Sequence, residues 1–242
     1  MKKHTFSIVI FTLVIALLFA ACEKREIAAI KSMGYSPDAA GFIQALREKN
    51  ADAVPLFLAI GVSPNATDEV GRNALAYAAM MNNIELMEIL VAKGAAIDAM
   101  DRDGQTPLMA ALIAKADNAA RWLVKKGASV NPKTPGGLTP LMLACNVGRR
   151  DNALMVDFLI EKGADVNARD AMGRTPLMYA AGKIRKRSVE VLVAKGADVN
   201  ARDNEGRSLL YYLSGEGERA ARDEIIAFLK KHGLTEGEKQ HK

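Results

Sequence analysis

The residues that could do chemistry are few and scattered. The sequence has three histidines and two cysteines, namely His4, His232, His241, Cys22 and Cys145. It contains no His-Glu-x-x-His, paired Cys-x-x-Cys, Gly-x-Ser-x-Gly or phosphate-binding glycine loop. Aspartates that precede glycines, such as Asp103, are explained by turn formation. We therefore predict that the protein is not an enzyme and binds no metal, cofactor or small-molecule substrate.

Cys22 is the best candidate for a chemically modified residue. It follows an uncharged apolar run, Phe6 to Ala21, that comes after a short positive N-terminus. As a helix these 16 residues would measure about 24 Å, less than a bilayer core of about 30 Å. The run therefore favours a signal peptide over 1–21 rather than a membrane span. The segment from Leu18 to Cys22 resembles the lipobox of bacterial lipoproteins, although Phe19 stands where that family usually has Leu.

The lipobox resemblance implies that Cys22 becomes the acylated N-terminus of a lipid-anchored protein that faces the periplasm of a bacterial cell envelope. Several acyl chains are needed for stable anchoring. Glu23 slightly favours the outer membrane. An ordinary cleaved signal and a retained anchor are the alternatives. Removal of two lysines with the signal lowers Lys plus Arg from 33 to 31 against 28 Asp plus Glu, a net charge of +3, so charge alone does not indicate an anionic partner.

A repeat dominates the rest of the sequence. Five glycines recur at intervals of 33, 33, 36 and 33 residues, namely Gly61, Gly94, Gly127, Gly163 and Gly196. The triplet Thr-Pro-Leu keeps the same period at 106–108, 139–141 and 175–177. Thr caps a helix, Pro costs no hydrogen bond at the first helical position, and Gly supplies the left-handed residue after a helix. The period therefore predicts a series of helix pairs.

The order of these parts resembles the ankyrin repeat. The resemblance covers about residues 38–234 and implies an all-α repeat solenoid, with about six helix-turn-helix repeats and finger turns after an N-terminal signal or anchor helix. We expect the repeats at about 38–66, 67–99, 100–132, 133–168, 169–201 and 202–234, numbered one to six below. Residues 22–37 would be anchor and tether, and 235–242 a disordered tail.

Two departures from the family pattern stand out. Repeat four has three extra residues, which we expect between its helices near Gly148. The family's His after Thr-Pro-Leu is replaced by Met109, Met142 and Met178. The resemblance implies that this replacement removes a side-chain hydrogen bond between neighbouring repeats. Cys145 falls at a small-residue position of an expected inner helix, so we expect it to be buried.

The resemblance also implies where a partner binds: on the finger tips, between the fingers and at the ends of the first helices. Carried onto this sequence, the partner-binding positions are Val70, Arg72, Met80, Met81, Met100, Arg102, Gln105, Ile113, Leu138, Arg169, Met172, Arg174, Arg202 and Arg207, with Lys133 at a matching position. Flexible methionines flanked by arginines suit protein recognition. Packing between repeats is the alternative for the methionines. We expect a membrane-anchored protein–protein interaction module of the envelope, acting as an inhibitor, immunity protein or scaffold.

A basic loop supports a second reading. It comprises Arg149, Arg150, Lys183, Arg185, Lys186 and Arg187, all expected between helices of repeats four and five. Such a loop would suit anionic lipid or polymer in a structural envelope component, or it would serve solubility alone. Nucleic acid is not expected as a partner, because the signal exports the protein and no aromatic platform accompanies the basic run.

Overall fold

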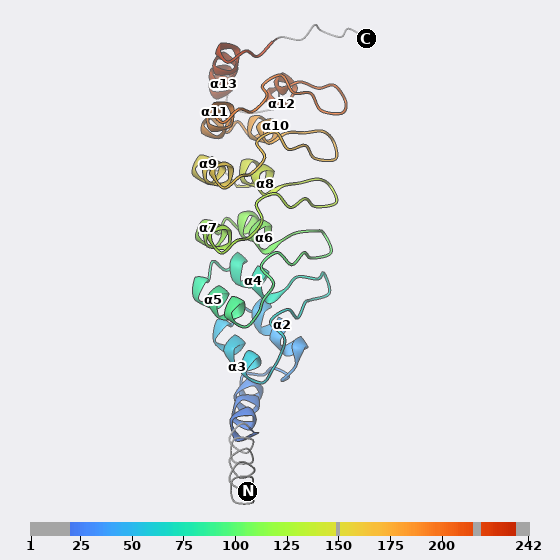
Figure 1. Cartoon of the computed structure of the whole chain (residues 1–242), viewed down its shortest axis with the longest axis vertical. Helices are drawn as coiled ribbons and strands as arrows, with labels where there is room; N and C mark the ends of the chain where they lie inside the picture. Colours follow the sequence, from blue (N-terminus) through green and yellow to red (C-terminus); the bar gives the residue numbers. More distant parts are fainter. Residues whose placement is uncertain (1–19, 149–150, 215–218, 236–242) are drawn as a thin grey trace, which may run out of the picture. The chain divides into compact units, whose positions relative to one another are not determined.

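The protein folds into helices joined by hairpin-like fingers, as the computed structural model in Figure 1 shows. The structure describes residues 20–148, 151–214 and 219–235, so the predicted signal peptide lies almost wholly outside it. Within the described residues the only β-type pairing is an isolated bridge between Thr67 and Asn73. The predicted all-α repeat architecture is confirmed.

Six helix pairs follow one another in the described chain. Residues 20–32 are helical and precede them. The pairs are α2 (Ala39–Arg47) with α3 (Val54–Ala59), which follows the short helix η1 (Ala51–Ala53); α4 (Ala74–Met80) with α5 (Ile84–Ala92); α6 (Pro107–Ala114) with α7 (Asp117–Lys125); α8 (Pro140–Asn146) with α9 (Ala153–Glu161); α10 (Pro176–Gly182) with α11 (Lys186–Ala194); and α12 (Leu209–Leu213) with α13 (Arg219–Lys231).

The chain divides into two compact units, and the boundary passes through repeat two. One unit holds Met1–Ala78 and Glu85–Ala96, and the other holds Ala79–Ile84 and Ile97–Lys242. In the second unit the first helices α6, α8, α10 and α12 pack in one layer beside the fingers, while α9, α11 and α13 pack in a second layer (Figure 1). Each repeat thus buries its apolar side against its neighbours.

The first helices begin as the sequence predicts. The Thr106, Thr139 and Thr175 hydroxyl oxygens accept hydrogen bonds from backbone N–H groups three residues later, and a proline follows each threonine. The methionines that replace the family's histidine are buried in the core. Cys145 is buried as expected, and its burial raises the pKa of the thiol.

Two of the second helices, α7 and α11, are capped by the preceding repeat. None of α7, α9 and α11 has a side-chain cap of its own. Instead the Asn82 side-chain oxygen Oδ1 accepts from the Ala119 N–H of α7 at 2.9 Å, and the Asp151 carboxylate accepts from the Arg187 N–H of α11 at 2.7 Å and from Ser188. These caps join neighbouring repeats, and the sequence pattern did not reveal them.

An asparagine ladder also joins neighbouring repeats. The Asn131 amide donates to the Gly163 carbonyl at 2.8 Å and accepts from the Asp165 N–H at 2.9 Å. Asn65, Asn167 and Asn200 make the same pair of bonds to the repeat that follows each of them. The ladder supplies hydrogen bonds between repeats in a protein that lacks the family's histidine.

The expected tether is partly a folded element. Ile30 is fully buried, and the Tyr35 hydroxyl donates to Glu48 at 2.8 Å and accepts from Asn50 at 3.2 Å. Residues 30–35 therefore belong to the first unit. In the expected tail, the Thr235 N–H donates to Asn200 at 2.9 Å, while 236–242 lie outside the described residues.

Candidate partner-binding surface

The fingers of the second unit are held together by backbone hydrogen bonds. The Ala171 N–H donates to the Gly136 carbonyl at 3.0 Å, and the Asn204 N–H donates to the Met172 carbonyl at 2.9 Å. The approach is close: a Cβ atom on Gly173, whose φ is +77°, would lie 2.8 Å from the Asn204 nitrogen. The fingers of repeats four to six therefore form a fixed row on which side chains are held one repeat apart.

Most of the large apolar side chains that the described residues expose lie at positions predicted to bind a partner. Five of these eight side chains are predicted positions, namely Val70, Met80, Met100, Ile113 and Met172, with exposed fractions of 39%, 36%, 53%, 39% and 54%. Val70 belongs to the first unit and the other four to the second. The buried methionines of the core are a separate set, so packing does not account for these exposed ones.

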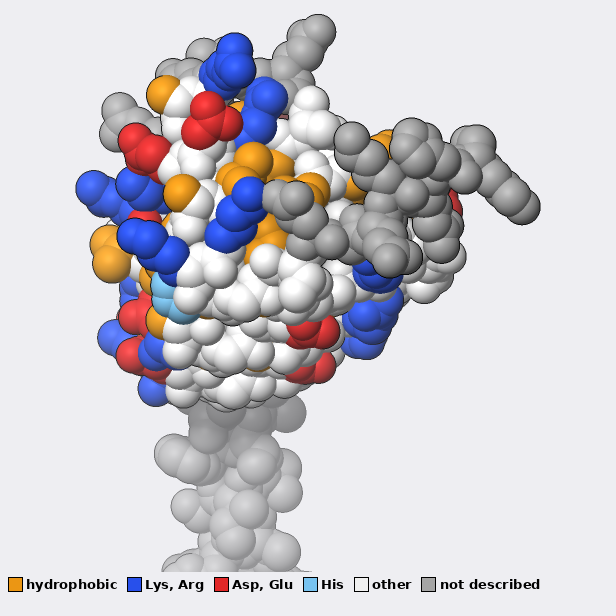
Figure 2. Space-filling model, turned by 90° about the horizontal axis from the view of Figure 1, so that it is seen from above, with side chains coloured by type: hydrophobic (Ala, Val, Ile, Leu, Met, Phe, Trp, Pro, Cys, Tyr) orange, Lys and Arg blue, Asp and Glu red, His pale blue; other side chains and the backbone are white. Residues whose placement is uncertain are grey.

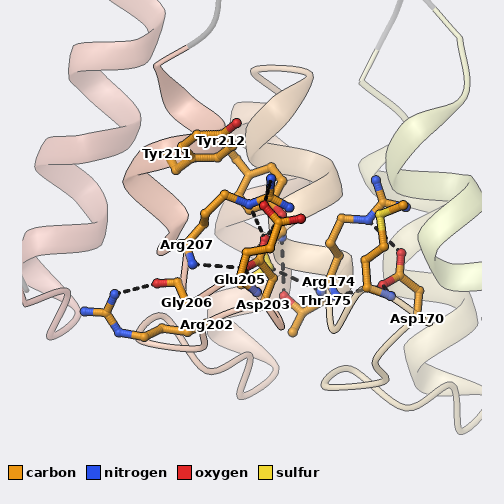
Figure 3. Close-up of polar contacts among 12 residues, drawn as sticks. Asp170, Arg174, Thr175, Arg202, Asp203, Glu205, Gly206, Arg207, Tyr211 and Tyr212 are labelled. Carbon is orange, nitrogen blue, oxygen red and sulfur yellow. Dashed lines mark hydrogen bonds and ion pairs between the residues drawn. The ribbon is translucent and has the colours of Figure 1, made fainter. Parts of the chain in front are cut away.

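Asp203 organises the finger of repeat six. Its Oδ1 accepts from the Glu205 and Arg207 N–H groups, and its Oδ2 lies 2.6 Å from Arg207 Nε and accepts from the Tyr212 hydroxyl (Figure 3). Burial alone would raise the pKa of Asp203, but the Tyr212 and Arg207 hydrogen bonds outweigh it and lower the pKa to about 2. Burial and the nearby carboxylate raise the pKa of Tyr212 to about 12. The finger is thus fixed by a buried charged network.

Repeat five has the same network. Arg174 Nε lies 2.7 Å from Asp170 Oδ2, which also accepts from the Tyr179 hydroxyl at 2.8 Å. The arginine carbon Cζ lies 4.8 Å from the centre of the Tyr179 ring, within range of a cation–π contact. Arg174 and Arg207, both predicted to bind a partner, are therefore engaged in holding their own fingers.

The first unit has a variant of this network. Asp68 accepts from the Tyr77 hydroxyl at 2.8 Å, while the nearest ion-pair partner is Arg47, 3.8 Å away, which also pairs with Glu69. Arg72 lies over the Tyr77 ring at 5.6 Å. The sequence signal for all three networks is Asp followed by Arg four residues later and Tyr nine residues later, at 68, 72 and 77, at 170, 174 and 179, and at 203, 207 and 212.

The cations between the fingers behave differently. Lys133, Arg169 and Arg202 are exposed, and no carboxylate of the described residues lies within ion-pair distance of them. Lys133 Nζ donates to the Arg169 carbonyl at 3.4 Å, Arg169 donates to the Arg202 carbonyl, and Arg202 donates to the Gly206 carbonyl at 2.8 Å. Figure 3 shows Arg202 beside Gly206, apart from the Asp203 network.

The remaining predicted partner-binding positions differ in exposure. Arg102 is exposed at the tip of the finger of repeat three, and Gln105 and Leu138 are half-buried behind their tips. Met81 is half-buried after α4. A pocket of about 140 Å³ opens beside Arg174 and is lined further by Asn146, Lys183 and Tyr212. Its volume suits one side chain of a partner.

The predicted basic loop is only partly a basic surface. Arg185 is buried, at 9% exposure, and its guanidinium donates to the Gly148 carbonyl of the preceding repeat. Lys186 pairs with Glu224 at 2.7 Å. Lys183 and Arg187 are exposed, and Arg149 and Arg150 lie outside the described residues. The prediction was wrong for Arg185, because the sequence showed its charge and not the carbonyl that binds it.

Residues 20–148, 151–214 and 219–235 contain no cluster of three or more potential metal ligands. No helix there is long and apolar enough to cross a bilayer. Figure 2 views the molecule from above, relative to Figure 1, and shows apolar side chains with Lys and Arg beside them on that face. Tyr211, in repeat six, is 54% exposed.

Comparison with known families agrees with this architecture. A family model described as ankyrin repeats, in three copies, matches residues 42–134 and 129–203. No curated protein sequence matches the chain at a significant level. The two matched ranges cover well over half of the sequence and include the fingers and helix pairs described above. The chain therefore belongs to the ankyrin-repeat family, whose repeats are protein–protein interaction modules.

Proposed function

We propose that the protein binds a partner protein on the fingers and first helices of its second unit, and that a lipid on Cys22 holds it to a bacterial envelope membrane. The observation that carries the first part is the concentration of exposed apolar side chains on the fingers and first helices. Met100, Ile113 and Met172 are exposed although the core has buried methionines elsewhere. Exposed apolar groups of this kind, flanked by arginine, are typical of protein interfaces. Binding without catalysis is part of the proposal.

The anchor is supported by the position of Cys22. This residue is exposed, and only eight positions separate it from the fully buried Ile30. Eight helical residues span about 12 Å, so an acylated Cys22 would keep the repeats close to the lipid surface. We infer a periplasm-facing protein, with the outer membrane favoured by Glu23. An inhibitor, an immunity protein and a scaffold all fit a module held in this way.

Site-specific photocrosslinking tests the binding surface. A photoreactive residue at Met172 should give a discrete adduct in cells, and a second one at Met100 should give the same adduct. Leu154 on α9 is the matched control, because it is 78% exposed and lies on a second helix away from the fingers. The surface is misassigned if Leu154 gives the adduct and the two finger positions do not.

An intact mass tests the anchor separately. The membrane fraction should contain a protein that begins at Cys22 and carries acyl groups, and Cys22→Ser should abolish the acylated form. A full-length unmodified chain would refute the anchor and leave the binding surface standing. The rival function, a structural component that binds anionic lipid through its basic loop, is weakened by the burial of Arg185 and the ion pair of Lys186.

A further inference from the structure

We propose that Lys133, Arg169 and Arg202, called the cation row below, bind an extended acidic segment of the partner that places one carboxylate against each repeat. This proposal rests on the proposed partner-binding function and gives its chemistry. The three residues occupy the same position in repeats four, five and six, directly before the residue that starts each finger. Among residues 20–148, 151–214 and 219–235, no carboxylate lies within ion-pair distance of any of these three exposed cations.

The nearby arginines Arg174 and Arg207 differ from the row residues because they form ion pairs with carboxylates. Arg174 and Arg207 lie within 2.7 and 2.6 Å of buried carboxylates, and Arg207 also pairs with Glu205. The row residues instead donate to backbone carbonyls of the next repeat or of their own finger. A carbonyl orients a cation without neutralising it. Lys has three N–H donors and Arg has five, so each row residue keeps donors for an incoming carboxylate.

The spacing of the row selects the conformation of the segment. The row residues belong to fingers that are locked by the Gly136–Ala171 and Met172–Asn204 backbone hydrogen bonds, so their spacing is fixed. Helices packed side by side lie about 8–10 Å apart, which sets the distance between repeats. An extended chain advances about 3.3 Å per residue, so every third residue meets a new repeat. The row residues offer charged groups held on backbone carbonyls, whereas a bound amphipathic helix needs an apolar groove for its buried face.

The row predicts a sequence rule for the ligand: acidic residues at i, i+3 and i+6 of an extended segment. The probes are three fluorescent peptides of equal composition in a Ser/Thr background, with Glu at i, i+3 and i+6, at i, i+1 and i+2, or at i, i+7 and i+14. Anisotropy at low salt with the full chain measures their affinities. Exposed ion pairs contribute up to about fivefold each, so the first peptide should bind more tightly than the others by roughly tenfold or more.

Charge-matched variants separate the row from net charge. Arg169→Ser with Arg202→Ser should weaken the first peptide by roughly tenfold and abolish its advantage over the others. Lys125→Ser with Lys162→Ser removes the same charge from exposed helix ends and should change its affinity less than twofold. Equal affinity for all three peptides, or tighter binding of the i, i+7, i+14 peptide, would overturn the proposal.

Two further outcomes are informative. In the first outcome, the native protein shows no preference among the peptides, and the Arg169→Ser, Arg202→Ser variant loses binding to phosphatidylglycerol vesicles. This outcome would show that the row binds lipid and would overturn the proposal. A partner crosslinked at Met172 that the same variant retains unchanged would overturn the cation row as a binding site while leaving the proposed function intact. Loss of that crosslink in the row variant, and its retention in the Lys125, Lys162 variant, would support both.

Discussion

Breaking one rung of the asparagine ladder should destabilise the protein measurably. Asn167→Ala removes two hydrogen bonds to the next repeat: the amide N–H to the Gly196 carbonyl, 3.0 Å, and the Asp198 N–H to the side-chain oxygen, 2.9 Å. A protein hydrogen bond contributes about 0.5–1.5 kcal/mol. Because Asn167 is exposed, water can hydrogen-bond to the backbone groups that the variant leaves unpaired, which lowers the free-energy cost of the substitution. We expect the free energy of unfolding to fall by about 1–2 kcal/mol, and the melting temperature by about 3–6 °C.

The assay is urea unfolding followed by far-UV circular dichroism, with thermal melts as a second measurement. Asn118→Ala is the matched control, because Asn118 is exposed on α7 and outside the ladder; it should change stability by less than about 0.5 kcal/mol. Asp98 occupies the ladder position of repeat two and only accepts, from the Ser129 N–H. Asp98→Asn supplies the missing donor and should not destabilise. An Asn167→Ala variant as stable as Asn118→Ala would refute the role of the ladder.

Three further predictions concern buried or capping groups. Asn73 caps α4 through its oxygen but buries an amide nitrogen without a partner, so Asn73→Thr should raise the unfolding free energy by about 1 kcal/mol; an unchanged or lower urea midpoint would contradict this. Asp151→Ala removes the cap of α11 and should cost about 1–2 kcal/mol in the same assay, with Asp151→Asn costing less; equal costs would argue against capping. The folded pKa of Asp203 is about 2, below its usual 3.8, so its contribution is present above pH 4 and is lost as pH falls towards 2. The stability difference between the native protein and Asp203→Asn should therefore shrink by up to about 2 kcal/mol between pH 5 and pH 2, and a pH-independent difference would count against the network.

Local features of the fold could be predicted from the sequence because their causes are local. Thr106 caps the N–H of Met109 three residues later, and Gly94 ends its helix with a φ of +91°. Both depend on residue type within one turn of helix. The caps of the second helices could not be predicted in this way. Asp151 caps a helix that begins 35 residues later in the chain, and only the stacking of repeats brings the two together.

The candidate site shows the same limit more sharply. Arg169 and Arg174 are the same residue type five positions apart, and both are predicted from the sequence to bind a partner. The structure pairs Arg174 with a buried carboxylate and leaves Arg169 exposed on a carbonyl. Arg185 was expected on the surface and is buried on Gly148. The sequence shows that an arginine carries a charge, but the fold of the neighbouring turn determines whether a carboxylate lies beside it. The sequence therefore could not distinguish arginines that stabilise a finger from arginines that are exposed to a partner.

Repeats three and four lack the arginine that stabilises the fingers of repeats five and six. At the place of Arg174 and Arg207, repeats three and four have Gln105 and Leu138. Repeat four starts its finger with Thr134, whose hydroxyl accepts from the Leu138 N–H at 3.1 Å and needs no cation to neutralise it. The finger is therefore closed without a charged network, and its outer position is free to be apolar. At the position directly before each finger, the residue changes from the exposed Met100 in repeat three to Lys133, Arg169 and Arg202 in repeats four to six. A segment that satisfies both parts has one orientation only, with its apolar residues towards repeat three and its carboxylates on repeats four to six.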